Sequence, residues 1–159
     1  MKIDIRKAVA ADQSLVMDII IRTDFFRQVE VIIAREVFEE AVSEKPGCTY
    51  QSYVATIDNK VVGWICFGQT PCTLGTFDIY WIAVERDHQR HHVGTEMLSF
   101  AEGQIASQKG RLSVVETSGS DKYKATQKFY IKNGYHQAAS VADFYAPGDS
   151  KLIFTKVIG

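Results

Sequence analysis

One short stretch of the sequence has the residue types and spacing to hold a phosphate group. In the segment 82–95, an apolar run leads through a short polar turn into a helical pattern. The first turn of a helix leaves backbone N–H groups unpaired, and they carry about half a positive charge, so a pyrophosphate placed there meets several donors. Gly94 would let the backbone approach the phosphate, and Arg90 would add a guanidinium contact. An ordinary strand-to-helix connection shares these features, so this segment alone leaves both interpretations open.

The histidines and cysteines do not predict a metal site. Three histidines crowd into the same turn, but neighbouring histidines in a loop rarely share one tetrahedral centre. The three cysteines are odd in number and lack metal-ligand spacing, and we predict small hydrophobic side chains in a reduced, cytoplasmic protein. These residues are His88, His91, His92, Cys48, Cys66 and Cys72.

The elements that must position this turn follow from apolar periodicity. Helical spacing predicts four helices: one whose buried face holds Leu15, Val16, Ile19 and Ile20, then Phe25–Val42 with Val29, Ile33, Val37 and Ala41 as its buried face, 92–108, and Lys122–Asn133. Shorter apolar runs predict an opening strand at Ile3 and Ile5, and then Tyr50–Ile57, Val61–Gly68, Phe77–Val84, Leu112–Glu116, Tyr135–Val141 and Leu152–Val157. The order is β-α-α-β-β-β-α-β-α-β-β, which predicts one α+β domain over residues 1–159 with a mixed, mostly antiparallel sheet and Phe77–Val84 at its centre.

Composition excludes several classes of function. The chain has 159 residues, 46% hydrophobic and 23% charged, with a formal net charge of -1. This balance is typical of a single globular domain and gives no sign of a nucleic-acid surface or a polybasic membrane patch. No apolar run approaches the roughly 20 residues of a membrane span, and the N-terminus resembles a strand rather than a signal peptide.

Two motifs resemble those of the GNAT superfamily of N-acetyltransferases. The strand Tyr80–Val84 followed by Gln89–Gly94 is similar to its motif A, with His92 in place of the middle glycine. Downstream, Ala125–Tyr135 is similar to its motif B, in which an aromatic-Tyr pair precedes Gly-Phe or Gly-Tyr. Both motifs in this order, together with the order of the elements, extend the resemblance over nearly the whole chain.

The resemblance implies acetyl-CoA as co-substrate and a set of residues that bind it. Main-chain groups of the strand before motif A would pair with the pantetheine arm, and the backbone of the following turn would hold the pyrophosphate. These cofactor-binding residues are Ile82, Ala83, Val84, Gln89, Arg90, His91, His92, Val93, Gly94 and Thr95. Simple core packing is the alternative for the strand residues.

The resemblance also implies catalytic residues. Tyr130 matches the tyrosine that acts as general acid on the departing CoA sulfur; a phenol with a pKa near 10 is protonated at neutral pH. The attacking amine must first lose a proton, and Asp78 is the first candidate base because a carboxylate among apolar residues is poorly explained by packing. Glu116 is the second candidate. The alternatives are a core tyrosine, an aspartate at the solvent edge and a salt-bridged strand end.

We therefore predict an N-acetyltransferase whose acceptor is a primary amine, of a small molecule or of a protein, attacked directly. The loop Asp143–Asp149, with two acids and two aromatics, would suit a cationic amine, or it is an ordinary turn. A CoA-binding sensor without catalysis is the alternative function, which the substitution at His92 favours. A nucleotide-binding domain needs a glycine-rich turn after the first strand, which is missing. The oligomeric state is open, a homodimer included.

Overall fold

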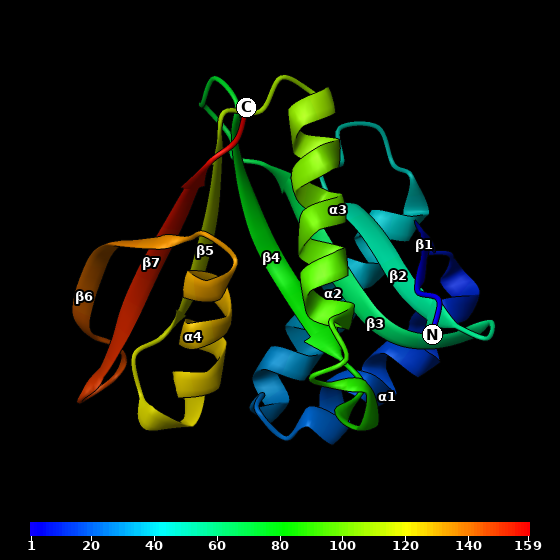
Figure 1. The fold of residues 1–159 in the computed structure, drawn as a ribbon, viewed down its shortest axis with the longest axis horizontal. Coiled ribbons are helices and arrows are strands. Elements are labelled where there is room, and N and C mark those ends of the chain that lie inside the picture. Colours follow the sequence, from blue (N-terminus) through cyan, green and yellow to red (C-terminus); the bar gives the residue numbers. More distant parts are fainter.

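A seven-stranded mixed sheet is the framework of the computed structural model, which describes residues 1–159 (Figure 1). The strands are β1 (Asp4–Lys7), β2 (Gln51–Ile57), β3 (Lys60–Gln69), β4 (Thr76–Val84), β5 (Leu112–Ser118), β6 (His136–Ala146) and β7 (Asp149–Val157). The helices are α1 (Gln13–Thr23), α2 (Gln28–Ser43), α3 (Val93–Ser107) and α4 (Lys124–Lys132), with short 3-10 turns at Ala10–Asp12, Arg86–His88 and Asp121–Tyr123. The predicted order of elements and the α+β class are confirmed.

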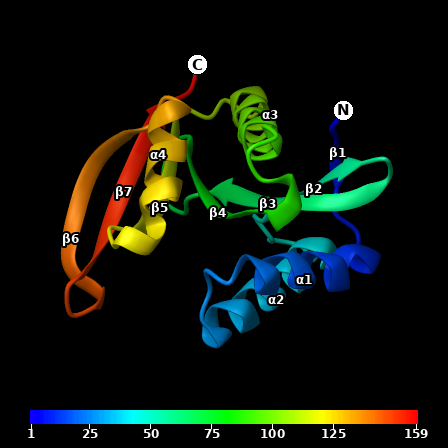
Figure 2. The ribbon, with the colours of Figure 1, turned by 60° about the horizontal axis from the view of Figure 1, so that its bottom comes forward.

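The sheet is antiparallel except at its centre. Its strand order is β1-β2-β3-β4-β5-β7-β6, and only β4 and β5 run parallel. Helices α1 and α2 cover one face, and α3 lies on the other (Figure 2). The prediction that β4 is central is therefore confirmed. None of the helices combines the length and apolarity that crossing a bilayer requires.

A bulge in β4 reverses the alternation of side chains between the two faces of the sheet. Ile79 pairs with Phe67 and Trp81 with Cys66, so Tyr80 between them has no partner on β3. Before the bulge, Ile79 packs in the core beneath α3, whereas beyond it Trp81 packs against α1 and α2. Because successive side chains of a strand alternate between faces, one extra residue reverses which side chains face α3.

Strands β4 and β5 separate along their length. Their ladder holds only from Thr76–Ile79 on β4 and from Leu112–Val115 on β5. Beyond it, β4 stays paired with β3, and β5 stays paired with β7. Figure 1 shows the two strands close together near the C-terminus and diverging toward the N-terminal end of α3, with α4 beside β5. The main chain at the end of β4 is thus unpaired on its β5 side.

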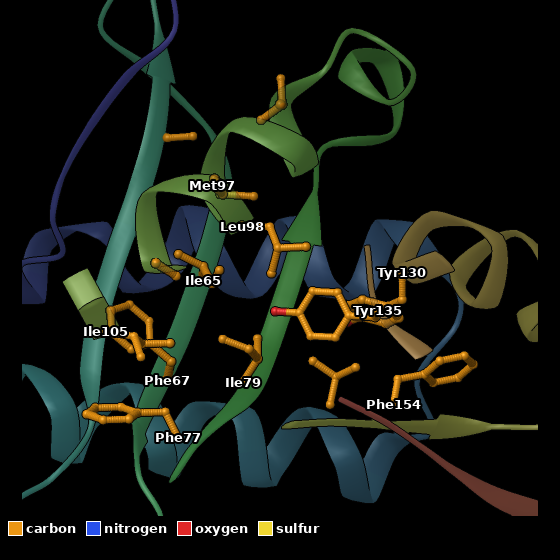
Figure 3. Close-up of a cluster of buried hydrophobic side chains, with 14 of the residues drawn as sticks. Ile65, Phe67, Phe77, Ile79, Met97, Leu98, Ile105, Tyr130, Tyr135 and Phe154 are labelled. Atoms are coloured by element: carbon orange, nitrogen blue, oxygen red, sulfur yellow. The ribbon is translucent and has the colours of Figure 1, made fainter. Parts of the chain in front are cut away.

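Two hydrophobic cores hold the sheet between the helices. In the larger one, Phe67, Phe77 and Ile79 meet Met97 and Ile105 of α3, and this core continues to α4 and β7 through Tyr130, Tyr135 and Phe154 (Figure 3). The predicted α3 face is confirmed, since Val93, Met97, Ala101 and Ile105 are all at most 1% exposed. Burying each large apolar side chain stabilises the fold by roughly 1.5–3 kcal/mol. This core therefore fixes α3 and α4 against the same face of the sheet.

The smaller core shows where the predicted helix faces were wrong. On α2, the predicted Ala41 is buried and the predicted Val37 packs partly buried against this core, but Val29 and Ile33 are about half exposed. Ala34 and Phe38 are buried in their place. Leu15 of α1 is likewise exposed, although its predicted neighbours on the buried face are buried. The chosen stripe of α2 contains two alanines, which let the helix approach the sheet closely around the Phe38 ring, 5.7 Å from that of Trp64.

The predicted loop Asp143–Asp149 was also wrong. Strands β6 and β7 extend through most of it and form a long hairpin whose turn is only Pro147-Gly148. Asp143 has a positive φ of 56° at an irregularity of β6, and its carboxylate accepts a hydrogen bond from Gly148 N–H at 2.7 Å. This bond lets the hairpin close tightly, and Tyr145 and Asp149 become strand residues.

The cysteines do not all fill the core. All three are free thiols, but only Cys66 is buried, whereas Cys72 is exposed in the loop between β3 and β4. The prediction of small buried side chains therefore holds for one of them and is wrong for Cys72.

Candidate functional site

A cleft of about 1070 Å³ opens where β4 and β5 separate. Its walls come from α2, β4, the N-terminal turn of α3, β5, α4 and the β6–β7 hairpin. All three predicted catalytic residues line it, as do all predicted cofactor-binding residues except His91 and Val93. Val93 is buried in the core instead. The cleft thus brings together residues as far apart in the sequence as Thr23 and Asp149.

The ladder between β3 and β4 decides which main-chain groups face the cleft. Glu85 N–H donates to Val62 C=O at 2.7 Å. Since bonded and non-bonded pairs alternate in an antiparallel ladder, Ala83 is bonded to β3, whereas Ile82 and Val84 direct their groups toward the open side. The Gln89 side chain donates to Val84 C=O at 3.2 Å. The unpaired main-chain groups are therefore the N–H and C=O of Ile82 and the N–H of Val84. Ala83 lines the cleft, but its main-chain N–H and C=O are bonded to β3.

The turn before α3 holds its shape without the missing glycine. His92 is the N-cap residue of α3 and adopts a left-handed conformation, with φ of 64°, and Arg90 does the same at 67°. A left-handed conformation costs a non-glycine residue about 1–2 kcal/mol. No side chain caps the helix, so the N–H groups of its first turn stay available for a ligand. With His92 in place of glycine, the turn therefore keeps the left-handed backbone conformation that a glycine would adopt.

Gly94 has a packing role as well. A Cβ built on Gly94 would lie 3.3 Å from ring atoms of Phe129 on α4. The absence of a side chain therefore lets α4 approach the first turn of α3, which sets the width of the cleft at this point. We predicted that Gly94 faces a phosphate; the structure adds the close contact with Phe129.

Tyr130 is a buried residue whose hydroxyl group has no partner in the chain. The residue is only 5% exposed, and its ring packs against those of Phe129, Tyr135 and Phe154 at centroid distances of 5.3, 5.7 and 6.1 Å. No side chain or main-chain group bonds its hydroxyl, although Tyr130 lines the cleft. Burial raises the pKa of the phenol well above its ordinary value near 10, so the group is a proton donor throughout the physiological range.

Asp78 lies on the opposite face of the sheet from Tyr130. Its neighbours Phe77 and Ile79 pack in the core beneath α3, so alternation directs Asp78 toward the α1–α2 face. Thr70 Oγ1 donates to Asp78 Oδ2 at 2.6 Å, which leaves Oδ1 free. Burial and the negative charge of Asp78 raise the pKa of the nearby Tyr80 phenol to about 12. Asp78 is thus a carboxylate without an ion-pair partner at the edge of the cleft.

Glu116 shares that face but is already paired. It lies two residues beyond Val114, the β5 residue opposite Asp78, so the two carboxylates are on the same side of the sheet. Lys151 Nζ lies 2.7 Å from Glu116 Oε2, and the Glu116 side chain is 45% exposed. Its alternative interpretation as a salt-bridged strand residue matches this geometry, and Asp78 is the better placed of the two candidates.

The wall of the cleft formed by α2 and the β6–β7 hairpin includes two residues, Glu30 and Tyr123, that the sequence did not indicate. Glu30 of α2 and Asp149 of β7 add carboxylates, and Tyr123 and Tyr145 add phenols whose pKa values are raised by burial and then by these charges. Tyr123 donates from its hydroxyl to Phe25 C=O at 2.9 Å and so ties the α1–α2 connection to the turn before α4. No common motif links these segments, and only Asp149 and Tyr145 had been noted.

Charge differs between the two sides of the cleft. Arg90, Lys128 and Lys132 line it near the first turn of α3 and along α4. The opposite side carries the four carboxylates, partly offset by Arg27, which lies 3.5 Å from Glu30, and by Lys122. A cationic wall suits phosphate groups, and an anionic one suits an amine. No three His, Cys, Asp or Glu side chains are grouped to hold a metal ion.

Comparison with known proteins identifies the family of the chain. The family model of the acetyltransferase (GNAT) domain matches residues 48–137, more than half of the chain. A GNAT-family protein from Desulfovibrio desulfuricans is 34% identical over 99% of this chain and 100% of its own, with a TM-score of 0.95. The protein therefore belongs to the GNAT family of acetyltransferases.

More distant structures share the fold. An aminoglycoside 6'-N-acetyltransferase solved with coenzyme A has a TM-score of 0.75 at 17% identity, over 98% of this chain and 97% of its own. The ribosomal-protein-S18-alanine N-acetyltransferase from Escherichia coli has a TM-score of 0.75 at 18% identity, over 99% and 95%. No curated protein matches the sequence. The two relatives act on different acceptors, so the fold leaves the acceptor undetermined.

Proposed function

We propose that this protein transfers the acetyl group of acetyl-CoA to the primary amine of a small molecule by direct attack. One observation supports this most strongly: Tyr130 and Asp78 line the same cleft from opposite faces of the splayed sheet. Attack on a thioester needs a base on the side of the amine and a donor near the departing sulfur. In the gap between β4 and β5, the Asp78 carboxylate lies on one face of the sheet and the Tyr130 hydroxyl on the other.

The acetyl donor, acetyl-CoA, would lie along the unpaired end of β4. Ile82 and the Val84 N–H offer the strand-like partners that a pantetheine chain with two amides can use. The N-terminal turn of α3, with Arg90, would hold the pyrophosphate. Asp78 first takes a proton from the ammonium, directly or through water. The neutral nitrogen then attacks the carbonyl carbon, the C–S bond breaks, and the departing thiolate takes up the proton that the nitrogen loses on becoming an amide.

Tyr130 would assist the departing thiolate by donating a hydrogen bond. A thiol has a reference pKa near 8.5, and burial places the pKa of Tyr130 well above that. A full proton transfer to sulfur would create a costly buried phenolate, so stabilisation of the developing charge is the favoured role. The hydroxyl is available for this because the chain leaves it without a partner.

Acetyl transfer is tested with a panel of primary amines, by following CoA release and identifying the acetylated product by mass spectrometry. We expect CoA release that depends on the amine and matches the product in amount. Saturable acetyl-CoA binding with no product from any amine would instead support the sensor function. The conformation of His92 removes the reason for which the sequence favoured the sensor, because the turn keeps its shape without glycine.

A further inference from the structure

Two carboxylates of the cleft lack an ion-pair partner, and they lie on different walls. Lys151 neutralises Glu116, and Arg27 lies beside Glu30. Asp78 on β4 and Asp149 on β7 have no such cation. Asp149 accepts a hydrogen bond from the buried Ser118 hydroxyl, which fixes one carboxylate oxygen and leaves the other free. Each wall thus has one uncompensated negative charge.

The surroundings of Asp149 suit an organic cation. Tyr123 and Tyr145 line the cleft together with Asp149, and aromatic faces beside a carboxylate attract ammonium groups. Of the cations on this side, Lys122 lies over the Phe25 ring, with its Nζ 5.8 Å from the centroid, and makes no ion pair with Asp149. A neutral ligand group would leave the Asp149 charge uncompensated within the cleft.

Tyr130 offers a hydrogen-bonding group to the same cleft from another wall. Tyr130 is only 5% exposed, and its hydroxyl has no partner in the chain. Such a group is normally hydrogen-bonded when buried. If the acetyl-CoA sulfur lies beside Tyr130, an acceptor that reaches the thioester can extend from there toward Asp149 on the β7 wall.

We infer that the acceptor carries a second cationic group, which binds Asp149 between Tyr123 and Tyr145 while its primary amine reacts. This inference rests on the proposed acetyl transfer. The reacting amine must become neutral beside Asp78, whereas the second cationic group stays charged. The second group therefore needs a carboxylate of its own, and Asp149 provides it.

The sheet register gives the length of such an acceptor. Asp78 is level with Val114 on β5, and Asp149 bonds Ser118, four residues further along that strand. Four residues of strand span about 13 Å, roughly the length of an extended diamine with eight to ten carbons.

The test compares 1,8-diaminooctane with 8-amino-1-octanol, which replaces the second ammonium by a neutral hydroxyl. We expect kcat/KM to favour the diamine on the order of tenfold. Asp149→Asn should bring this ratio close to one. Asp121→Asn should keep it, since Asp121 is an exposed carboxylate of the neighbouring turn that does not line the cleft.

Three results would overturn the inference. Equal kcat/KM for both amines in the natural protein would refute the second cation site but leave acetyl transfer intact. A diamine preference that survives Asp149→Asn would place the second site elsewhere. Acetyl-CoA binding without acetylation of either amine, or of any other amine, would remove the proposed function and this inference with it.

Discussion

Replacing Tyr130 by phenylalanine should slow acetyl transfer without unfolding the protein. The hydroxyl has no partner in the chain, so its removal breaks no internal hydrogen bond, and the ring keeps its contacts with Phe129, Tyr135 and Phe154. A positioned donor to charge that develops in the transition state is typically worth 10²–10⁴-fold. We expect kcat and kcat/KM to fall together by about a hundredfold, or roughly 2.7 kcal/mol, while acetyl-CoA affinity changes little.

Tyr135→Phe is the matched control. Tyr135 is equally buried and belongs to the same cluster, but its hydroxyl bonds Ser113 at 2.8 Å and it does not line the cleft. This variant should lose about 1 kcal/mol of stability and keep its turnover, both measured by denaturant unfolding and CoA release. Equal losses of turnover in both variants would mean that packing explains the effect. Full activity of Tyr130→Phe would refute the role of the hydroxyl.

Three further results are expected. Thr70→Val removes the 2.6 Å hydrogen bond that orients the Asp78 carboxylate, so kcat/KM should fall by about tenfold, whereas Thr70→Ser should keep it; an unchanged kcat/KM in Thr70→Val would contradict a role of the oriented carboxylate as base. Acetyl-CoA at 100 times its Kd should stabilise the fold by about 2.7 kcal/mol in thermal unfolding, and Gly94→Pro should abolish this gain; no shift at millimolar acetyl-CoA would contradict the binding site. The Arg6 hydrogen bond lowers the pKa of Asp12, so the stability that this pair contributes is present above about pH 4 and is lost as the pH falls through the lowered pKa. Asp12→Asn should therefore lower the free energy of unfolding by about 1–2 kcal/mol at pH 7. Urea unfolding at about pH 2 should no longer show this difference.

The sequence predicted best where one apolar stripe had no rival. In α3 the positions from Val93 to Ile105 face the core as their spacing indicates. Helix α2 carries apolar residues on more than one side, so periodicity could not choose between the stripe of Val29 and Ile33 and that of Ala34 and Phe38. Packing against the sheet made that choice.

The site shows a similar division. The motifs identified Tyr130 and the turn before α3 because these segments are continuous in the chain. The bulge at Tyr80, which turns Trp81 toward α1 and α2 and Ile82 toward the opposite face, has no clear sequence signal. Residues such as Glu30 reach the cleft only through the tertiary packing of segments that are distant in sequence.

A single-turnover experiment with radiolabelled acetyl-CoA tests direct transfer across the splayed strands. Enzyme in excess is mixed with acetyl-CoA and the best amine acceptor, quenched at intervals and separated into CoA, acetylated amine and protein. We predict that CoA and acetylated amine appear at one rate, with no label on the protein and no CoA release when the amine is omitted. Label that passes through the protein before it reaches the amine, or CoA that forms without acetylated amine, would contradict the account.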